Sequence, residues 1–174
     1  MVGDPAQPLQ LGPGEGPTVI SPVGGPLTFK ARGEQTGGEL IAFESVAAPG
    51  EGPPLHRHAN EAEILYVLEG SFRFKLEDET RDAPPGSFVF VPRGVPHTWQ
   101  NVGDAPGRLL VIFTPSGMER FFDRFAELPD DASVADAFRR IGAEAGMETV
   151  GPPLAQSDPI RPARISGRGG RHGR

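Results

Sequence analysis

Apolar and polar residues alternate along several short stretches of the chain, which is the pattern of β-strands that bury one face. The clearest stretch is 71–77, where Phe72, Phe74 and Leu76 share one side and polar or charged residues occupy the other. The pattern predicts strands over 18–20, 27–31, 39–47, 64–68, 71–77, 87–91, 98–101 and 108–114. Many short strands separated by glycine and proline turns are typical of an all-β sandwich or barrel.

Two stretches depart from simple alternation. Residues 64–68 are apolar on both faces, as in a strand that is covered on both sides. Residues 77–82 are polar throughout, and we interpret them as a turn between two strands.

Beyond residue 115 the apolar residues take up the period of helices. Ser116 and Glu119 have the spacing of a capping box, and an apolar stripe follows them. Ser133 and Asp136 predict the start of a second helix, which Gly146 ends. The predicted organisation is a disordered arm over 1–17, a barrel over 18–115, a helical segment packed on the barrel over 116–150 and a Gly/Pro/Arg-rich tail over 151–174.

Composition narrows the functional classes. The 174 residues include no cysteine, which excludes disulfides, thiolate metal sites and a cysteine nucleophile, and which fits a cytoplasmic location. The net charge is −6, but residues 161–174 hold five arginines and no acid, so the rest carries 12 basic against 23 acidic groups. An acidic body predicts no nucleic-acid partner. The apolar runs are strand-sized, and we expect no membrane partner.

Candidate chemistry is concentrated in residues 50–101. His56 and His58 are two apart, so in a strand their side chains leave the same face. Glu63 follows after a short break, and His97 follows two prolines that restrict the backbone. Neutral imidazoles and a carboxylate suit a divalent ion. Glu61 shares the strand parity of Glu63 and is a rival for the carboxylate position.

The spacing of these residues is similar to that of a known family. Residues 50–70 match Gly-x5-His-x-His-x4-Glu-x6-Gly, and residues 86–101 match Gly-x5-Pro-x-Gly-x2-His-x3-Asn, without a departure. Both are signature motifs of the cupin superfamily, and together they span 52 of 174 residues. The chain resembles small single-barrel cupins that are described as quercetin 2,3-dioxygenase-like. The resemblance implies a jelly-roll β-barrel with C-terminal helices.

The resemblance also implies roles for single residues. His56, His58, Glu63 and His97 correspond to the ligands of one divalent ion per chain, which is Fe, Mn, Ni, Cu or Zn. Glu63 is the predicted catalytic residue, a ligand that also accepts a substrate proton. For the walls of a substrate pocket we single out four aromatic residues: Tyr66, Phe74, Phe90 and Trp99.

The leading functional hypothesis is a metal-dependent, dioxygenase-like enzyme that acts on a small enolisable or aromatic compound. Two alternatives stay open, a redox-neutral isomerase or hydrolase at the same site and a non-catalytic barrel that binds or senses a small molecule. From the same family resemblance we expect a homodimer.

Overall fold

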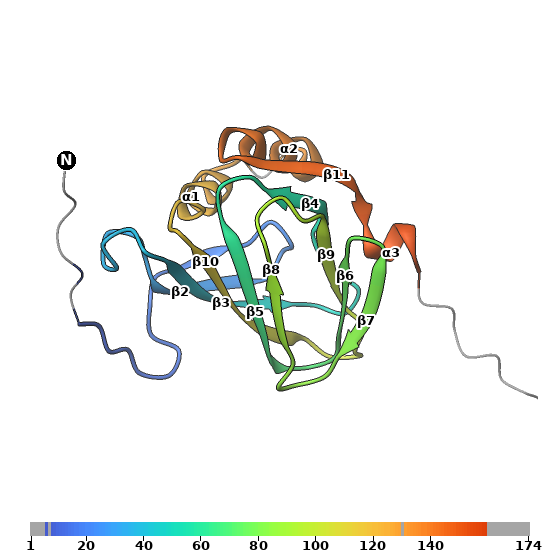
Figure 1. Ribbon diagram of the computed structural model, residues 1–174, viewed down its shortest axis with the longest axis horizontal. Helices are drawn as coiled ribbons and strands as arrows, with labels where there is room; N and C mark the ends of the chain where they lie inside the picture. The colour runs from blue at the N-terminus through green and yellow to red at the C-terminus, as the bar shows by residue number, and fades with distance from the viewer. Residues whose placement is uncertain (1–5, 7, 130, 160–174) are drawn as a thin grey trace, which may run out of the picture.

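Two antiparallel sheets pack against each other as a barrel in the computed structural model, which describes residues 6, 8–129 and 131–159 (Figure 1). The first sheet has the strand order β1 (Thr18–Ile20), β2 (Pro26–Ala31), β3 (Ile41–Ala47), β10 (Gly107–Thr114), β5 (Ala62–Glu69) and β8 (Phe88–Val91). The second has the order β11 (Met147–Pro153), β4 (Pro54–His58), β9 (His97–Asn101), β6 (Phe72–Leu76) and β7 (Glu79–Ala83). This is the predicted jelly-roll barrel.

The alternation of apolar residues determines which face of each strand is buried. In β3 every second residue, from Ile41 through Phe43 to Ala47, lies inside the barrel, and β10 alternates in the same way. Each fully buried Leu, Ile or Phe stabilises the fold by roughly 1.5–3 kcal/mol, so the inner faces supply most of the driving force. The predicted strands all occur, with ends that move by one or two residues.

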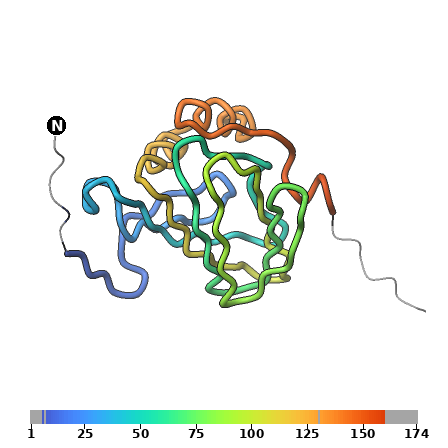
Figure 2. Tube along the Cα trace, in the orientation of Figure 1, coloured from blue at the N-terminus to red at the C-terminus, as the bar shows by residue number. Residues whose placement is uncertain are grey.

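Three helices follow the barrel strands: α1 (Glu119–Ala126), α2 (Val134–Glu144) and the short α3 (Leu154–Ser157). In Figures 1 and 2, α1 and α2 lie over one end of the barrel, which their buried side chains Phe121, Phe122 and Phe138 close. A bidentate pair between Arg32, just after β2, and Asp123 attaches α1 to the first sheet at 2.7 and 2.8 Å. None of the described helices combines the length and the hydropathy that a bilayer span requires.

The two predicted helix starts have different outcomes. Ser133 caps α2 by accepting a hydrogen bond from the backbone of Asp136, as predicted. In α1 the N-cap is Met118, no side chain caps it, and Glu119 instead accepts hydrogen bonds from the backbone of Gly117 and Gly33. The prediction of a capping box formed by Ser116 and Glu119 is therefore wrong, because Glu119 instead joins α1 to the loop after β2.

Two segments differ from their predicted state. Residues 79–83 form β7 rather than part of a turn, and the turn shrinks to Glu77 and Asp78. β7 is an edge strand whose side chains are mostly exposed, so its polar sequence is tolerated. Residues 147–153 form β11, and α3 follows it, where the tail was expected to begin. β11 is also an edge strand, and its register shifts accommodate glycine and proline. Residues 160–174 of the tail lie outside the described residues.

Candidate metal centre

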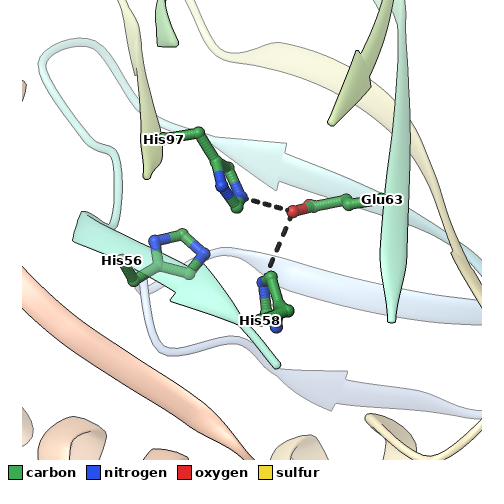
Figure 3. A group of neighbouring side chains, drawn as sticks. All are labelled: His56, His58, Glu63 and His97. Carbon is green, nitrogen blue, oxygen red and sulfur yellow. Dashed lines mark hydrogen bonds and ion pairs between the residues drawn. The ribbon is translucent and has the colours of Figure 1, made fainter. Parts of the chain in front are cut away.

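Three strands bring the four predicted ligands together inside the barrel (Figure 3). His56 and His58 lie on β4, where their spacing of two gives both the buried face, while Arg57 between them is exposed. His97 begins β9, directly opposite His56 in the register. Glu63 comes from β5 in the other sheet, so the cluster joins the two sheets at this end of the barrel.

The distances in this cluster suit a shared ion. One ligand atom from each of the four residues can be chosen so that all lie within 4.8 Å of one another. The Nε2 atom of His97 lies 2.6 Å from Oε2 of Glu63, and Nε2 of His58 lies 3.5 Å from the same oxygen. All four side chains are buried. Such a set of three imidazoles and a carboxylate fits a divalent transition metal.

Backbone carbonyls orient two of the imidazole rings. Nδ1 of His56 donates to the carbonyl oxygen of Pro54 at 2.8 Å, and Nδ1 of His97 donates to that of Val95 at 2.9 Å. A donated Nδ1 proton leaves Nε2 as the coordinating atom, which is how metal-binding histidines are commonly held. Nδ1 of His58 has no hydrogen-bond partner, and its ring packs edge-on against Phe113 at 5.0 Å between centroids.

The charges of the cluster are strongly coupled. Burial alone would raise the pKa of Glu63, but the charge of His97 and hydrogen bonds from both histidines outweigh it, so the pKa lies well below its usual value. Burial would likewise lower the pKa of His97, yet Glu63 raises it. Burial and the neighbouring His97 and His58 lower the pKa of His56 well below normal.

The contacts of the His97 ring affect how an ion would bind. Its Nδ1 faces the carbonyl oxygen of Val95 and its Nε2 faces Glu63, and the charge of Glu63 raises the pKa of the ring. An ion that binds Nε2 therefore competes with a proton. Glu61, the rival carboxylate, is buried but does not join the cluster, and burial raises its pKa. The motif position Glu63, and not Glu61, therefore faces the histidines.

A cavity of about 60 Å³ adjoins the cluster. Apart from the cluster residues, its polar side chains are Ser21 and Ser45, and no lysine or arginine lines it. The rest of the wall is apolar and largely aromatic: Pro22, Val23, Leu27, Phe43, Pro53, Trp99, Val111, Phe113, Met118, Phe121, Phe122, Phe138 and Met147. The site therefore pairs a polar, metal-binding end with an apolar chamber.

The four aromatic residues predicted to line a pocket fall into two groups. Trp99 lines the cavity, and Phe74 is buried in the core without reaching it. Tyr66 and Phe90 are 39% and 52% exposed on the outside of the barrel, so their assignment is corrected. Tyr66 is three residues after Glu63, and an odd spacing in a strand reverses the face.

Sequence reasoning missed most of the chamber. Phe121 and Phe122 belong to the apolar stripe that follows Glu119, in the segment predicted to pack on the barrel, and their rings also close the cavity. Ser21, whose buried hydroxyl has no partner among the described residues, comes from the loop between β1 and β2. A polar residue at a buried position of a loop has no periodic signal, so only the structure places it.

Comparisons with known proteins agree with this fold. The cupin domain family matches residues 43–113. The curated relatives include Protein SchB of Streptomyces halstedii, 33% identical over 82 residues that cover 46% of this chain and 59% of SchB. They also include the tetracenomycin polyketide synthase protein TcmJ of Streptomyces glaucescens, 32% identical over 39% of this chain and 46% of TcmJ. The chain spans about half the length of the curated relatives it matches.

Among solved structures, the polyketide cyclase RemF of Streptomyces resistomycificus is 26% identical, with a TM-score of 0.54 over 63% of this chain and 81% of RemF. The family match, the barrel and the four residues at motif spacing agree with one another. Residues 43–113 thus form a cupin domain with a single barrel, and His56, His58, Glu63 and His97 form a cluster that fits the metal site of such a domain.

Proposed function

We propose that the protein is a metal-dependent enzyme that acts on a small, largely apolar compound with an enolic or phenolic oxygen. The observation that carries this proposal is the contrast within one cavity, where a His₃Glu cluster adjoins walls that are aromatic and aliphatic. A sugar phosphate or a small dicarboxylate needs cationic or multiple polar partners. The cavity wall offers no lysine or arginine, which disfavours both classes.

An ion at the cluster would be held by the Nε2 atoms of His56 and His97, by His58 and by Glu63. When bound, it supplies Lewis acidity toward a substrate oxygen and, if it is redox-active, electrons for reaction with dioxygen. Glu63 is the carboxylate of the cluster, so it is the group that would accept a substrate proton when it detaches from the ion. The apolar walls exclude water and orient the hydrocarbon part of the substrate.

The size of the chamber limits how a substrate enters. A cavity of about 60 Å³ is less than half of the ~150 Å³ that accommodates benzene in an engineered protein core. A substrate with an aromatic ring therefore has to displace side chains that close the cavity, and Phe122 and Phe138 from α1 and α2 are the ones at the helical end.

Two reaction classes fit this site, and dioxygen separates them. The dioxygenase-like reaction is our first candidate. A redox-neutral reaction, such as a cyclisation or isomerisation of a polyketide-like compound, is favoured by the likeness to the polyketide cyclase RemF. Turnover of enolisable and phenolic compounds with and without oxygen decides between them, since only the first class consumes oxygen. Binding of such compounds without turnover under either condition would contradict both and leave a binding barrel.

The metal requirement is tested by elemental analysis of protein purified without chelator or nickel affinity resin. We expect about one divalent ion per chain in the natural protein and a large loss in His58→Ala. Absence of metal from both proteins after reconstitution would remove the basis of the proposal. Glu63→Gln tests the proton-holding role, because natural turnover at full metal content in this variant would contradict it.

A further inference from the structure

Two serines lie in the otherwise apolar wall of the cavity, and neither belongs to the His₃Glu cluster. Ser21, in the loop between β1 and β2, is 4% exposed, and its buried hydroxyl has no partner among the described residues. Ser45 is 5% exposed and lies on the inner face of β3, in line with the apolar residues Ile41, Phe43 and Ala47. Buried hydroxyls are normally hydrogen-bonded, so an unpartnered one in a cavity wall is a candidate contact for a ligand.

The backbone brings the two serines to the same part of the cavity. Leu27 of β2 is the register partner of Ser45. Two residues before Leu27, the carbonyl oxygen of Gly25 accepts a hydrogen bond from the backbone of Ser21 at 2.8 Å. Gly25 also packs so closely on the backbone of Val46 that a Cβ atom would collide with the carbonyl oxygen there. Ser21 is therefore held beside the segment of β3 that carries Ser45.

The register of the first sheet shows how far the serines lie from the cluster. Phe113 of β10 pairs with Glu63, and Leu109 of the same strand pairs with Ser45. These two positions on β10 are four residues apart, which corresponds to ~13 Å along a strand. The serines and the cluster are therefore at opposite ends of the cavity.

The wall between these two ends is apolar. Val111 and Phe43 are register partners halfway along this path, and both line the cavity. Trp99 and Phe122 add further aromatic surface to the same wall. A ligand that fills this path meets imidazoles and a carboxylate at one end, hydrocarbon in the middle and two hydroxyls at the other end.

We propose that Ser21 and Ser45 form a second subsite, which hydrogen-bonds a hydroxyl or carbonyl oxygen at the far end of the substrate. This inference rests on the proposed function, since it takes the near oxygen of the substrate to lie at the cluster. Serine hydroxyls both donate and accept, so they match a neutral oxygen. A distal carboxylate or phosphate would lack a cationic partner, because no lysine or arginine lines the cavity.

The subsite narrows the class of substrate. The separation of the two ends selects an elongated compound with more than one ring, an oxygen at each end and a hydrocarbon body between them. Such a body exceeds the cavity of about 60 Å³, so Phe122 and Phe138 have to move for it, as they do for a single aromatic ring.

Two rigid compounds that differ by one distal oxygen test the subsite. 4-Hydroxybiphenyl carries a hydroxyl at one end, and 4,4′-dihydroxybiphenyl carries one at each end. The full chain is loaded with zinc, which is not redox-active, and each compound is titrated into it. Trp99 is the only tryptophan of the sequence and lines the cavity, so its fluorescence follows binding. We expect the dihydroxy compound to bind about tenfold more tightly, the gain from one or two neutral hydrogen bonds.

Ser21→Ala and Ser45→Ala remove the two hydroxyls, singly and together. The double variant should lose the preference for the dihydroxy compound and keep its affinity for 4-hydroxybiphenyl. Thr149→Val is the matched control, because it removes another buried hydroxyl without a partner among the described residues, and Thr149 does not line this cavity. This control should keep the full preference.

Two results would overturn the subsite and leave the proposed function intact. One is a preference that survives in the double variant, and the other is equal affinity of the natural protein for both compounds, once the two equivalent ends of the dihydroxy compound are counted. Failure of both compounds to bind would overturn the subsite together with the proposed substrate class. Metal content shows whether each variant keeps its barrel, and Ser21→Ala, a change in a loop, carries the test if the double variant does not fold.

Discussion

The two faces of β5 reverse the usual distribution of residues. On the inner face Glu63 is a carboxylate with 5% of its surface exposed, and three residues later Tyr66 is an aromatic residue with 39% exposed on the outer face. Buried charges and exposed aromatic residues both cost stability unless something compensates. The histidines opposite Glu63 supply the compensation inside. On the outside, no described residue covers Tyr66 or its neighbours Phe88 and Phe90.

Substitutions on the inner face should cost more than substitutions on the outer face. Removing one partner from a buried, hydrogen-bonded cluster leaves the others uncompensated, whereas removing an exposed ring removes little that a single chain uses. The comparison therefore predicts large effects on metal binding and folding from inner-face changes. It predicts small effects on both from outer-face changes.

The largest effect is expected for His97→Ala. This change removes one proposed ligand and the hydrogen bond to Glu63, so metal affinity should fall by more than the ~100-fold that loss of an outer-shell partner can cost. Calorimetric titration with cobalt or manganese measures it. Phe90→Ala, on the outer face, is the matched control and should bind the metal normally. Equal losses of metal affinity in the two variants would contradict the expected difference between the inner and outer faces.

A second pair of variants compares neighbours on β5. Leu65 is completely buried and Tyr66 is partly exposed, so Leu65→Ala should lower the free energy of unfolding by about 3 kcal/mol and Tyr66→Ala by about 1 kcal/mol or less. Denaturant unfolding gives both values. A cost for Tyr66 as large as that for Leu65 in the monomer would show that the outer face already matters within one chain.

A smaller effect concerns pH. Because Glu63 raises the pKa of His97, an ion competes with a proton for this ring. Metal affinity should therefore rise with pH up to the raised pKa of His97, by about tenfold for each pH unit below it. Titrations in buffers of different protonation enthalpy count the released proton. Affinity that does not change between pH 6 and 8 would contradict the protonation state inferred for His97.

Much of the inner face was predictable because strand periodicity and ligand spacing are local. The alternation in residues 71–77 gave β6, and the spacing of His56 and His58 placed both on one face. The outward position of Tyr66 and Phe90 was missed, although it follows from the same parity once Glu63 is fixed inside. Residues 64–68 are apolar on both faces, which predicted a strand with other elements packed on both of its faces. In the described residues, only the inner face of this strand is covered.

Other features had no local signal. β7 and β11 gain their structure from backbone pairing at sheet edges, which a polar or proline-containing sequence does not reveal. The predicted homodimer rested on family resemblance alone, and the sequence does not show which surface would form it. Packing of Phe122 and Phe138 over the barrel end depends on contacts between residues far apart in the chain.

The residues that line the cavity come from different parts of the chain. Half of the side chains that line it lie outside residues 43–113, on the loop after β1, on β2, on the two main helices and at the start of β11. The four residues of the cluster all lie within residues 43–113, whereas eight of the thirteen apolar residues that line the cavity lie in the flanking segments. Most of the apolar wall is thus encoded outside the segment that holds the four clustered residues, so exchanging the flanks between homologues would change the chamber and leave the cluster in place.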